Sequence, residues 1–481
     1  MKYANRPLAL LVAGALVVTL AGCSSSAVST LTASSAAGNV LSATESEVSL
    51  EGATAFTFTD SGISAAEGDY NGYTIEGTAL TISAAGTYVV SGSCADGSIT
   101  VKADTENVTL VLNGLELTST TTAPIVCGKS TGVTIAVQSG TQNTLADTTA
   151  NNKDNENASA DAESAVLKCK DGAQVVLCGS GTLNISAGDD ALHSDYTLNI
   201  GAEDTAGPAI TISTCNEALE GATLNVFSGT IDITATDDCL NAANGDLTDY
   251  DFSMNISGGT ITAYTSGGDG FDSNGSMTIS GGSITVWTAN AADNQPLDAD
   301  GTITITGGTV LAAGGSAGMG YTIDASQGYV TYGGGMGADS TVRLTKDSAF
   351  AITDASGNTV YSGTALCDAN YVFYCAQDVT ADSDYTLTTG STTLATATAQ
   401  TGTSRASFGG MGGGQNDMTP PDGANGQTPP AMNGSAPGGQ APDGQQGGTP
   451  PEKPTGTPSG NPPQMPAQNN ATSQAETTAD V

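Results

Sequence analysis

The sequence predicts an all-β protein built around a right-handed parallel β-helix, with a small C-terminal β-rich cap and a disordered tail. The first observation is composition: 63 of the 481 residues are glycine, 5% are aromatic and 12% are charged. This mixture suits short strands separated by tight turns rather than helix bundles. The second observation is a repeat of 21 to 31 residues in the middle of the chain. The third is the alternation of apolar and polar residues within each repeat, which is typical of strands.

Residues 1–22 are interpreted as a lipoprotein signal peptide. Lys2 and Arg6 precede a short apolar run, which ends in a Leu-Ala-Gly-Cys sequence at Cys23 that resembles a bacterial lipobox. In such proteins the signal is cut before the cysteine, whose thiol is then lipidated. We therefore expect Cys23 to anchor an extracellular protein to the outside of the cell membrane, with residues 23–50 as a flexible tether. A plain signal peptide or an uncleaved anchor is the alternative.

The repeat in residues 51–345 predicts the parallel β-helix, because stacked coils bury an apolar face that one coil cannot bury alone. Each repeat contains a large hydrophobe, a spacer and a small residue; the first and third should face the core and the spacer should face outward. A β-propeller or a calcium β-roll is the competing interpretation, but no nine-residue period is present. The triplets are Ile125-Val126-Cys127, Leu167-Lys168-Cys169, Leu192-His193-Ser194, Leu219-Glu220-Gly221, Leu240-Asn241-Ala242, Phe271-Asp272-Ser273, Leu297-Asp298-Ala299 and Ile323-Asp324-Ala325.

Three other segments complete the predicted organisation. An Asn/Asp-rich insertion at residues 140–162 is expected to be a loop by composition. Residues 346–405 are β-rich but carry no repeat, and we interpret them as a C-terminal cap. Residues 406–481 are rich in Gly, Pro and Gln and nearly devoid of aliphatic side chains, so this tail should be disordered. Several cysteines after Cys23 occupy apolar strand positions as small hydrophobes, and no Cys-x-x-Cys pair or histidine cluster indicates zinc.

The net charge restricts the class of partner. The formal charge is −38, from 49 acidic residues against 11 Lys and Arg residues. Such a chain repels nucleic acids and anionic membrane surfaces, so we expect no nucleic-acid partner. Cations, and molecules that cations can bridge, become the expected partners.

The spacer positions of the later repeats predict a calcium site. Stacked coils would place acidic spacers above one another, and two carboxylates about 5 Å apart repel by about 3 kcal/mol at an effective dielectric of 20. A cation between them removes this penalty, and hard oxygen ligands suit Ca²⁺. A solvated acidic face is the alternative. The candidate ligands from these spacers and the loops beside them are Asp237, Asp238, Asn241, Asp269, Asp272, Asn274, Asp298, Asp300 and Asp324.

Two aromatic residues lie just before the acidic loops. Tyr264 and Trp287 follow the Gly-Gly pairs of consecutive repeats at the same distance, so both should face outward on adjacent coils. An exposed pair would form a stacking platform for sugar rings. The alternative is an aromatic ladder that stabilises the sheet.

The distribution of basic residues argues against catalysis. A pectate lyase generally needs Arg or Lys as its base, but none occurs between Lys170 and Arg343. His193, the single histidine, is expected at the surface beside acidic residues. A hydrolase would use paired carboxylates, for which the candidates are Asp189-Asp190 and Asp237-Asp238.

The run SGGTITAYTSGGDGFDSNGSMTISGGSITV, the QPLDADG loop and the GGMGGG segment resemble secreted clostridial-type carbohydrate-binding domain-containing lipoproteins. The resemblance covers residues 60–400. It implies a polysaccharide-lyase-like β-helix that carries calcium and binds acidic polysaccharide such as polygalacturonate, with cellulose as a further ligand. It also implies calcium ligation by all the candidate ligands given above except Asp324. The coils of Lys168 and His193 depart from the acidic pattern.

Together these observations predict a non-catalytic, lipid-anchored cell-surface protein that binds acidic, pectin-like polysaccharide with the help of Ca²⁺. The main alternative is a β-helical pectin-degrading enzyme of the polygalacturonase or pectate lyase type. The second alternative is a surface adhesin or stalk with no sugar ligand.

Overall fold

A computed structural model describes residues 49–66, 71–203, 205–289, 294–315, 322–333 and 342–405. The interpretations of residues 1–22, of Cys23 and of the 406–481 tail lie outside these residues. Within them the protein is all-β, and its single helical element is the short 3-10 helix η1 (Thr149–Asn151). No helix in the described part is long and apolar enough to cross a membrane.

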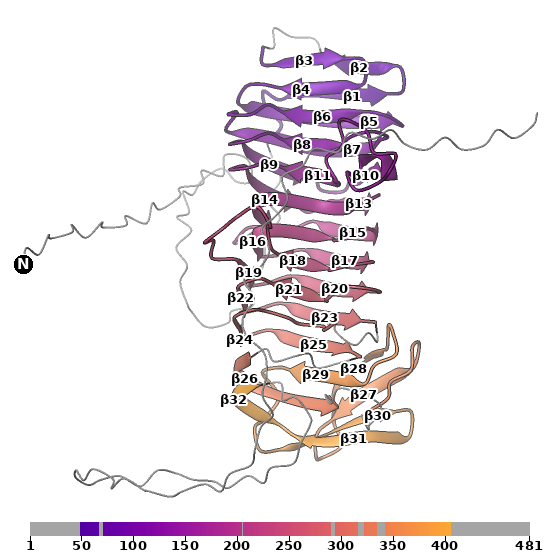
Figure 1. Cartoon of the computed structure of the whole chain (residues 1–481), viewed down its shortest axis with the longest axis vertical. Coiled ribbons are helices and arrows are strands. Elements are labelled where there is room, and N and C mark those ends of the chain that lie inside the picture. Colours follow the sequence, from indigo (N-terminus) through magenta and orange to yellow (C-terminus); the bar gives the residue numbers. More distant parts are fainter. Residues whose placement is uncertain are drawn as a thin grey trace, which may run out of the picture. The chain divides into compact units, whose positions relative to one another are not determined.

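Most strands belong to one 28-stranded mixed sheet (Figure 1). Its parallel pairings stack successive coils in three columns, A, B and C, and one passage of the chain through the three is called a coil. Column A contains β4 (Ala79–Ile82), β6 (Ser98–Val101), β8 (Ile125–Cys127), β11 (Ala165–Cys169), the first parts of β14 (Asp190–Ile200) and β16 (Leu219–Val226), β18 (Leu240–Ala242) and β21 (Phe271–Ser273).

Columns B and C run beside column A. Column B contains the first parts of β5 (Gly86–Cys94) and β7 (Val108–Ser119), then β9 (Gly132–Val137), β12 (Gln174–Gly179), the second parts of β14 and β16, β19 (Ser253–Ile256), β22 (Ser276–Ile279), β24 (Thr302–Ile305) and the start of β26 (Thr322–Gly333). Column C contains the ends of β5 and β7, then β10 (Gln142–Asp147), β13 (Thr182–Ser186), β15 (Ala209–Thr214), β17 (Thr230–Ala235), β20 (Thr260–Thr265), β23 (Ser283–Thr288) and β25 (Thr309–Gly314).

Antiparallel pairs lie at both ends of the columns. At the N-terminal end β1 (Thr54–Thr59) pairs with β2 (Gly62–Ala65), and β3 (Tyr73–Glu76) pairs with β4. At the C-terminal end β29 (Tyr371–Cys375) pairs with β25 and β26, and β32 (Gln400–Arg405) pairs with β26. A separate four-stranded sheet, the cap sheet, contains β27 (Ala349–Thr353), β28 (Thr359–Thr364), β30 (Asp384–Thr389) and β31 (Thr392–Thr398).

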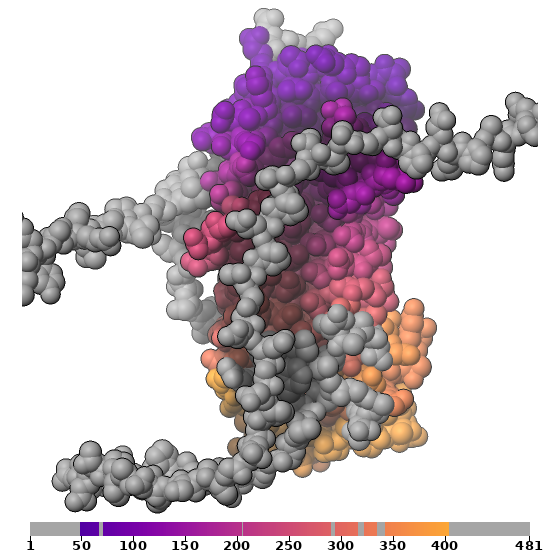
Figure 2. Space-filling model, in the orientation of Figure 1, coloured from indigo at the N-terminus to yellow at the C-terminus, as the bar shows by residue number. Residues whose placement is uncertain are grey.

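The hydrophobe–spacer–small triplets define the interior of column A. Leu167, Leu192 and Leu219 are register partners on successive coils, and Leu240 and Phe271 continue the same row. These side chains are fully buried in one core cluster that runs through the coils. Ser194 and Ser273, at the small positions, are also buried, so large and small side chains alternate across the row as close packing requires. Figure 2 shows the successive coils packed directly upon one another.

The repeated Gly-Gly pair lies where column B turns into column C. A Cβ at Gly281 would come within 2.2 Å of the Ser257 backbone oxygen of the preceding coil. Gly282 has a φ of 89°, in the left-handed region that side chains disfavour. The first glycine therefore permits the close approach of two coils, and the second permits the turn.

An asparagine ladder stabilises the outer side of column B. Asn225 Nδ2 donates to Asn199 Oδ1 (2.9 Å), and Asn255 Nδ2 donates to Asn225 Oδ1 (3.0 Å). Asn199 Nδ2 in turn donates to the Val175 carbonyl oxygen (3.1 Å). The ladder ties four successive coils together in the direction of stacking.

The insertion is partly ordered as a strand, so the expectation of a loop over residues 140–162 is wrong at its beginning. Gln142–Asp147 form β10, which pairs in parallel with β7 and β13. The alternation of Asn143 and Leu145 inward with polar neighbours is the local signal, and the Asn/Asp-rich composition obscured it. Asn143 is buried because its Oδ1 accepts from the backbone N–H groups of Gly114 and Leu115 (both 2.9 Å).

The segment predicted as a cap packs against the outer side of column C. A second core cluster joins Trp287 and Leu311 of β23 and β25 to Phe350, Val372 and Tyr374. The Thr285 and Tyr361 hydroxyls lie 3.3 Å apart, and Cys367 Sγ lies 3.1 Å from the Thr288 carbonyl oxygen. The outer face of column C is therefore an interior surface in its last coils.

Candidate metal centre

Three carboxylates converge where column C turns into column A. Asp269 lies in the turn before β21, and Asp272 is the outward residue of β21. Asp298 belongs to the next coil, where it follows Leu297, a residue that forms an isolated parallel β-bridge with Phe271. One carboxylate oxygen from each lies within 4.8 Å of the others. The local fold forms because Phe271 and Leu297 are buried in the core, which leaves the spacers on the outer side.

Backbone hydrogen bonds hold these carboxylates in place. Asp238 Oδ1 accepts from the Asp269 N–H (2.6 Å), and Asp298 Oδ1 accepts from the Ala299 N–H (2.8 Å). The Asp237 and Asp238 carboxylates also pack against Gly268, where an added Cβ would lie within 2.4 Å of both. Glycine at this position therefore lets the acidic residues of one coil approach the next coil.

Two buried amide side chains beside the carboxylates have oxygen atoms without a hydrogen-bond donor. Asn241 is 8% exposed and Gln295 is 5% exposed, and neither Asn241 Oδ1 nor Gln295 Oε1 has a hydrogen-bond partner. Their amide nitrogens are engaged, because Asn241 Nδ2 donates to Glu217 Oε2 (3.0 Å) and Gln295 Nε2 donates to Asp298 Oδ2 (3.1 Å). A buried oxygen without a donor costs free energy, and a bound cation would satisfy it.

Burial makes the ionised state of these acids unfavourable. It raises the pKa of Asp238 to about 8, that of Asp269 to about 7 and that of Asp272 to about 6. Burial also raises the pKa of Asp298, and the charges of neighbouring carboxylates add to the effect at each site. A cation beside these carboxylates would lower their pKa values and favour the fully ionised centre. Carboxylate and amide oxygens are the donors that Ca²⁺ prefers, so these residues fit a calcium ion.

The structure brings together most, but not all, of the residues that the sequence predicted. Asp237 and Asp300 lie at the edge of the centre, where both are exposed and Asp300 raises the pKa of Asp272. Asn274 is exposed at the end of β21, and its N–H donates to the Ala242 carbonyl oxygen (3.1 Å). Gln295 is not a spacer residue and was not predicted: its backbone N–H donates to Asp269 Oδ1 of the preceding coil, while its side-chain amide donates to Asp298 three residues later.

The assignment of Asp324 to this ladder is wrong. Ile323-Asp324-Ala325 pairs in register with Ile303-Thr304-Ile305, so Asp324 lies in column B rather than above Asp298. It is exposed, and its Oδ1 accepts from the Thr403 hydroxyl (3.2 Å). Columns A and B both show alternating hydrophobes, and this shared pattern caused the error.

The expectation of an exposed aromatic platform is also wrong. Tyr264 and Trp287 are register partners that face outward from the coils, as predicted. However, Trp287 is 0% exposed because the cap covers it, and Tyr264 is partly buried against the same cluster. The pair therefore contributes to packing between the coils and the cap.

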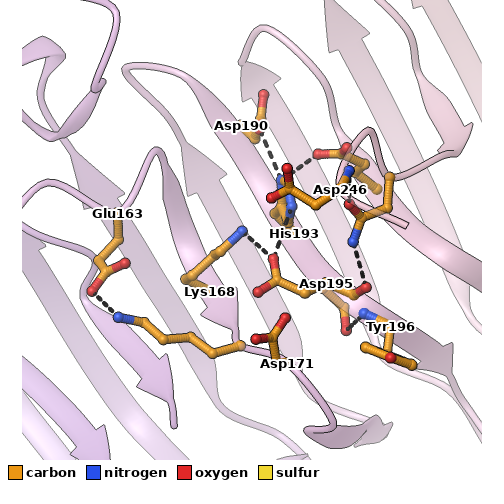
Figure 3. Close-up of polar contacts among 12 residues, drawn as sticks. Glu163, Lys168, Asp171, Asp190, His193, Asp195, Tyr196 and Asp246 are labelled. Atoms are coloured by element: carbon orange, nitrogen blue, oxygen red, sulfur yellow. Dashed lines mark hydrogen bonds and ion pairs between the residues drawn. The ribbon is translucent and has the colours of Figure 1, made fainter. Parts of the chain in front are cut away.

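Further along column A, toward the N-terminus, the spacers form a mixed cluster of charges (Figure 3). Lys168 Nζ donates to Asp195 Oδ1 (2.7 Å), and His193 lies between Asp190, Asp195 and Glu220. Burial alone would lower the pKa of His193, but hydrogen bonds to these three carboxylates raise it to about 11. Burial would raise the pKa of Asp195, but hydrogen bonds from His193 and Lys168 lower it. His193 is thus half-buried within a network, whereas the sequence predicted a surface histidine.

Comparison with known proteins supports one family. The model of the carbohydrate-binding domain-containing protein family matches residues 76–405. Among solved structures, the chain is similar to the polysaccharide lyase-like protein from C. thermocellum in a gadolinium derivative. That match has 24% identity and a TM-score of 0.41, and covers 52% of this chain and 96% of the other. The comparison with curated proteins gives no match.

Proposed function

Because the chain belongs to the carbohydrate-binding domain-containing protein family, we propose that it is a non-catalytic protein that binds acidic polysaccharide through Ca²⁺. The observation that carries the proposal is the convergence of Asp269, Asp272 and Asp298 within 4.8 Å. The unpaired buried oxygens of Asn241 and Gln295 support it independently. An oxygen-rich site that is costly to charge is the kind of site that calcium stabilises.

We further propose that the stacked coils form a right-handed parallel β-helix. Columns A, B and C repeat in the same order along the chain, and parallel crossover connections are overwhelmingly right-handed. This geometry would align the spacers of column A along one outer face, which would be the face that a linear polymer follows.

The ligand proposal follows from charge. A chain of formal charge −38 repels an acidic polymer such as polygalacturonate unless a cation lies between them. A calcium ion with open coordination positions accepts oxygen atoms from a uronate carboxylate. The protein's own residues would hold the ion from one side, through Asp269, Asp272 and Asp298. Cellulose, which is uncharged, is the alternative ligand and would need no such bridge.

The lack of Lys and Arg residues in the later coils supports a binding role. Between Lys170 and Arg343 the sequence contains no Lys or Arg, and the spacer Lys168 is engaged by Asp195 at 2.7 Å. A lyase would need a neutral, accessible base near the sugar. Incubation with polygalacturonate tests the enzyme alternative: unsaturated ends would indicate a lyase, and new reducing ends a hydrolase.

The proposed location is the outer side of the cell membrane, with lipidated Cys23 as the anchor. The Cys23→Ser variant should lose incorporation of labelled fatty acid and be released into the medium. Retention of the label in this variant would contradict the assignment of Cys23.

Binding in the presence and absence of calcium tests the function itself. Electrophoresis through a gel containing polygalacturonate should retard the protein in CaCl₂, and EDTA should abolish the retardation. The Asp272→Asn variant should bind weakly, whereas Asp324→Asn, which changes an acid outside the centre, should bind as the wild type does. Retardation that persists in EDTA would rule out the calcium bridge.

A glycan array tests the second alternative. An array that returns no ligand would favour a surface adhesin or stalk.

A further inference from the structure

A second group of candidate metal ligands lies on column A, apart from the acidic centre. Asp190 and His193 belong to β14, and Glu220 of β16 is the register partner of His193. One oxygen of each carboxylate and a ring nitrogen of His193 lie within 4.8 Å of one another. Figure 3 shows Asp190 and His193 pointing toward one another above Lys168 and Asp195.

Two carboxylates converge on the same nitrogen of His193. Asp190 Oδ2 lies 3.2 Å from His193 Nδ1, and Glu220 Oε2 pairs with the same nitrogen. A ring N–H has one hydrogen and can serve only one acceptor well. The three atoms are close enough together for one metal ion to be bound by all of them.

The other side of the ring is organised as in many metal sites. His193 Nε2 lies 3.4 Å from Asp195 Oδ1, and the same oxygen accepts from Lys168 Nζ (2.7 Å). A carboxylate on the far ring nitrogen fixes the tautomer and turns the other nitrogen toward a metal. The Asp195 backbone oxygen also accepts from Asn244 Nδ2 (2.7 Å), which holds this residue in place.

The carboxylate ligands have defined orientations as well. Asp190 Oδ1 accepts from the Glu217 N–H (3.2 Å), so its Oδ2 is the oxygen that faces His193. The side chains of Asp190, His193 and Glu220 are 12%, 20% and 14% exposed, which leaves access from solvent. Glu217 is an additional carboxylate residue nearby, since its own backbone N–H is the donor to Asp190 Oδ1.

We propose that His193 Nδ1, Asp190 Oδ2 and Glu220 Oε2 bind a divalent transition-metal ion, and that Zn²⁺ is the best match. An imidazole ligand distinguishes this site from the all-oxygen centre of Asp269, Asp272 and Asp298, because imidazole suits zinc and similar ions rather than calcium. The site was missed in the sequence because its ligands come from two coils, with no short spacing motif.

The sequence offers a direct test, because His193 is its single histidine. In untagged, metal-free protein labelled with ¹⁵N, the imidazole resonances belong to one residue. Addition of ZnCl₂ should shift the Nδ1 resonance to a metal-bound position and leave Nε2 protonated. Two protonated nitrogens that do not respond to ZnCl₂ would show that His193 is only an ion-pair partner, and would overturn the proposal.

Calorimetric titration with ZnCl₂ provides the second readout. The wild type should bind one more Zn²⁺ than His193→Gln, which retains all the cysteines and acidic residues. Asp195→Asn, which alters the residue behind the ring, should weaken this ion by 10- to 100-fold, as is typical for such partners. Asp272→Asn should bind this Zn²⁺ unchanged while it loses Ca²⁺, which separates the two sites. Equal Zn²⁺ stoichiometry in the wild type and His193→Gln would contradict the proposal.

Discussion

The indole of Trp287 lies edge-on against the ring of Phe350, with 5.8 Å between the ring centroids and 72° between their planes. This contact joins the third column of the coils to the cap sheet. It is reinforced by the stacked rings of Phe350 and Tyr361, whose centroids are also 5.8 Å apart. Aromatic packing therefore adds to the backbone pairing of β29 with β25 and β26 in holding the cap against the coils.

Replacement of Trp287 should destabilise the protein without affecting polysaccharide binding. The Trp287→Ala variant should lose about 3–5 kcal/mol of unfolding free energy, as is typical for a buried aromatic residue. Tyr264→Ala, at a partly exposed neighbouring position, should lose less. Denaturant unfolding and gel retardation check the two effects separately. Lost binding with unchanged stability would restore a role for Trp287 as a sugar platform.

Removal of one carboxylate from the acidic centre should abolish stabilisation by calcium. A ligand at 100 times its dissociation constant stabilises the folded state by about 2.7 kcal/mol, and Asp272→Asn and Asp298→Asn should lose most of this gain. In EDTA the same variants should unfold at or above the wild-type temperature, because a repulsive charge is gone. Thermal unfolding of each variant in CaCl₂ and in EDTA measures the stabilisation by calcium and the melting temperature without it. Asp324→Asn is the matched control, and a loss of the calcium effect in it would contradict the assigned register.

Asp147 should make stability depend on pH. Burial raises its pKa to about 6, although hydrogen bonds from Asn151 and the Gly188 N–H (2.6 Å) oppose the rise. The unfolded value is about 4, so the folded state binds more protons in between, and this carboxyl lowers stability as the pH rises from about 4 to about 6. The melting temperature of Asp147→Asn relative to the wild type should therefore increase over this window. Parallel curves in EDTA would refute the shift.

The asparagine ladder should be most sensitive at its middle. Asn225→Ala removes the bond to Asn199 Oδ1 and the bond from Asn255 Nδ2, and leaves these two atoms without those partners, which should cost about 1–3 kcal/mol. Asn255→Ala removes a single ladder bond and should cost about half as much. Urea unfolding of the two variants gives the comparison. Equal losses of unfolding free energy in the two variants would contradict the view that each ladder bond adds its own contribution to stability.

The repeat allowed the buried row and most of the acidic centre to be predicted, because alternation in a strand fixes which residues face inward. Phe271, Ser273 and Asp272 lie as that rule requires. Two errors have physical causes. Asp324 carries the correct local pattern, but that pattern also occurs in the neighbouring column. Trp287 faces outward as predicted, yet a segment more than 60 residues later in the sequence covers it.

Side-chain networks between coils were harder to predict. Gln295 completes the acidic centre through contacts to Asp269 and Asp298, and Asp195 completes the His193 cluster. Neither residue occupies a spacer position. Each combines a local contact, Gln295 with Asp298 and Asp195 with His193, with a contact to the preceding coil, to Asp269 and to Lys168 respectively. Single-sequence patterns specify which face a residue occupies, but not the distances between side chains on adjacent coils.

The antiparallel strands at the two ends also limit how molecules associate. A column of parallel strands exposes unpaired N–H and C=O groups at its first and last strand, and such edges recruit further strands from other molecules. In this protein β4 pairs with β3 at one end, and β26 pairs with β29 and β32 at the other. The parallel strands β4 and β26 are thereby covered by strands of the same chain. A strand from another molecule would therefore meet an antiparallel strand at these positions, rather than a parallel strand of the columns.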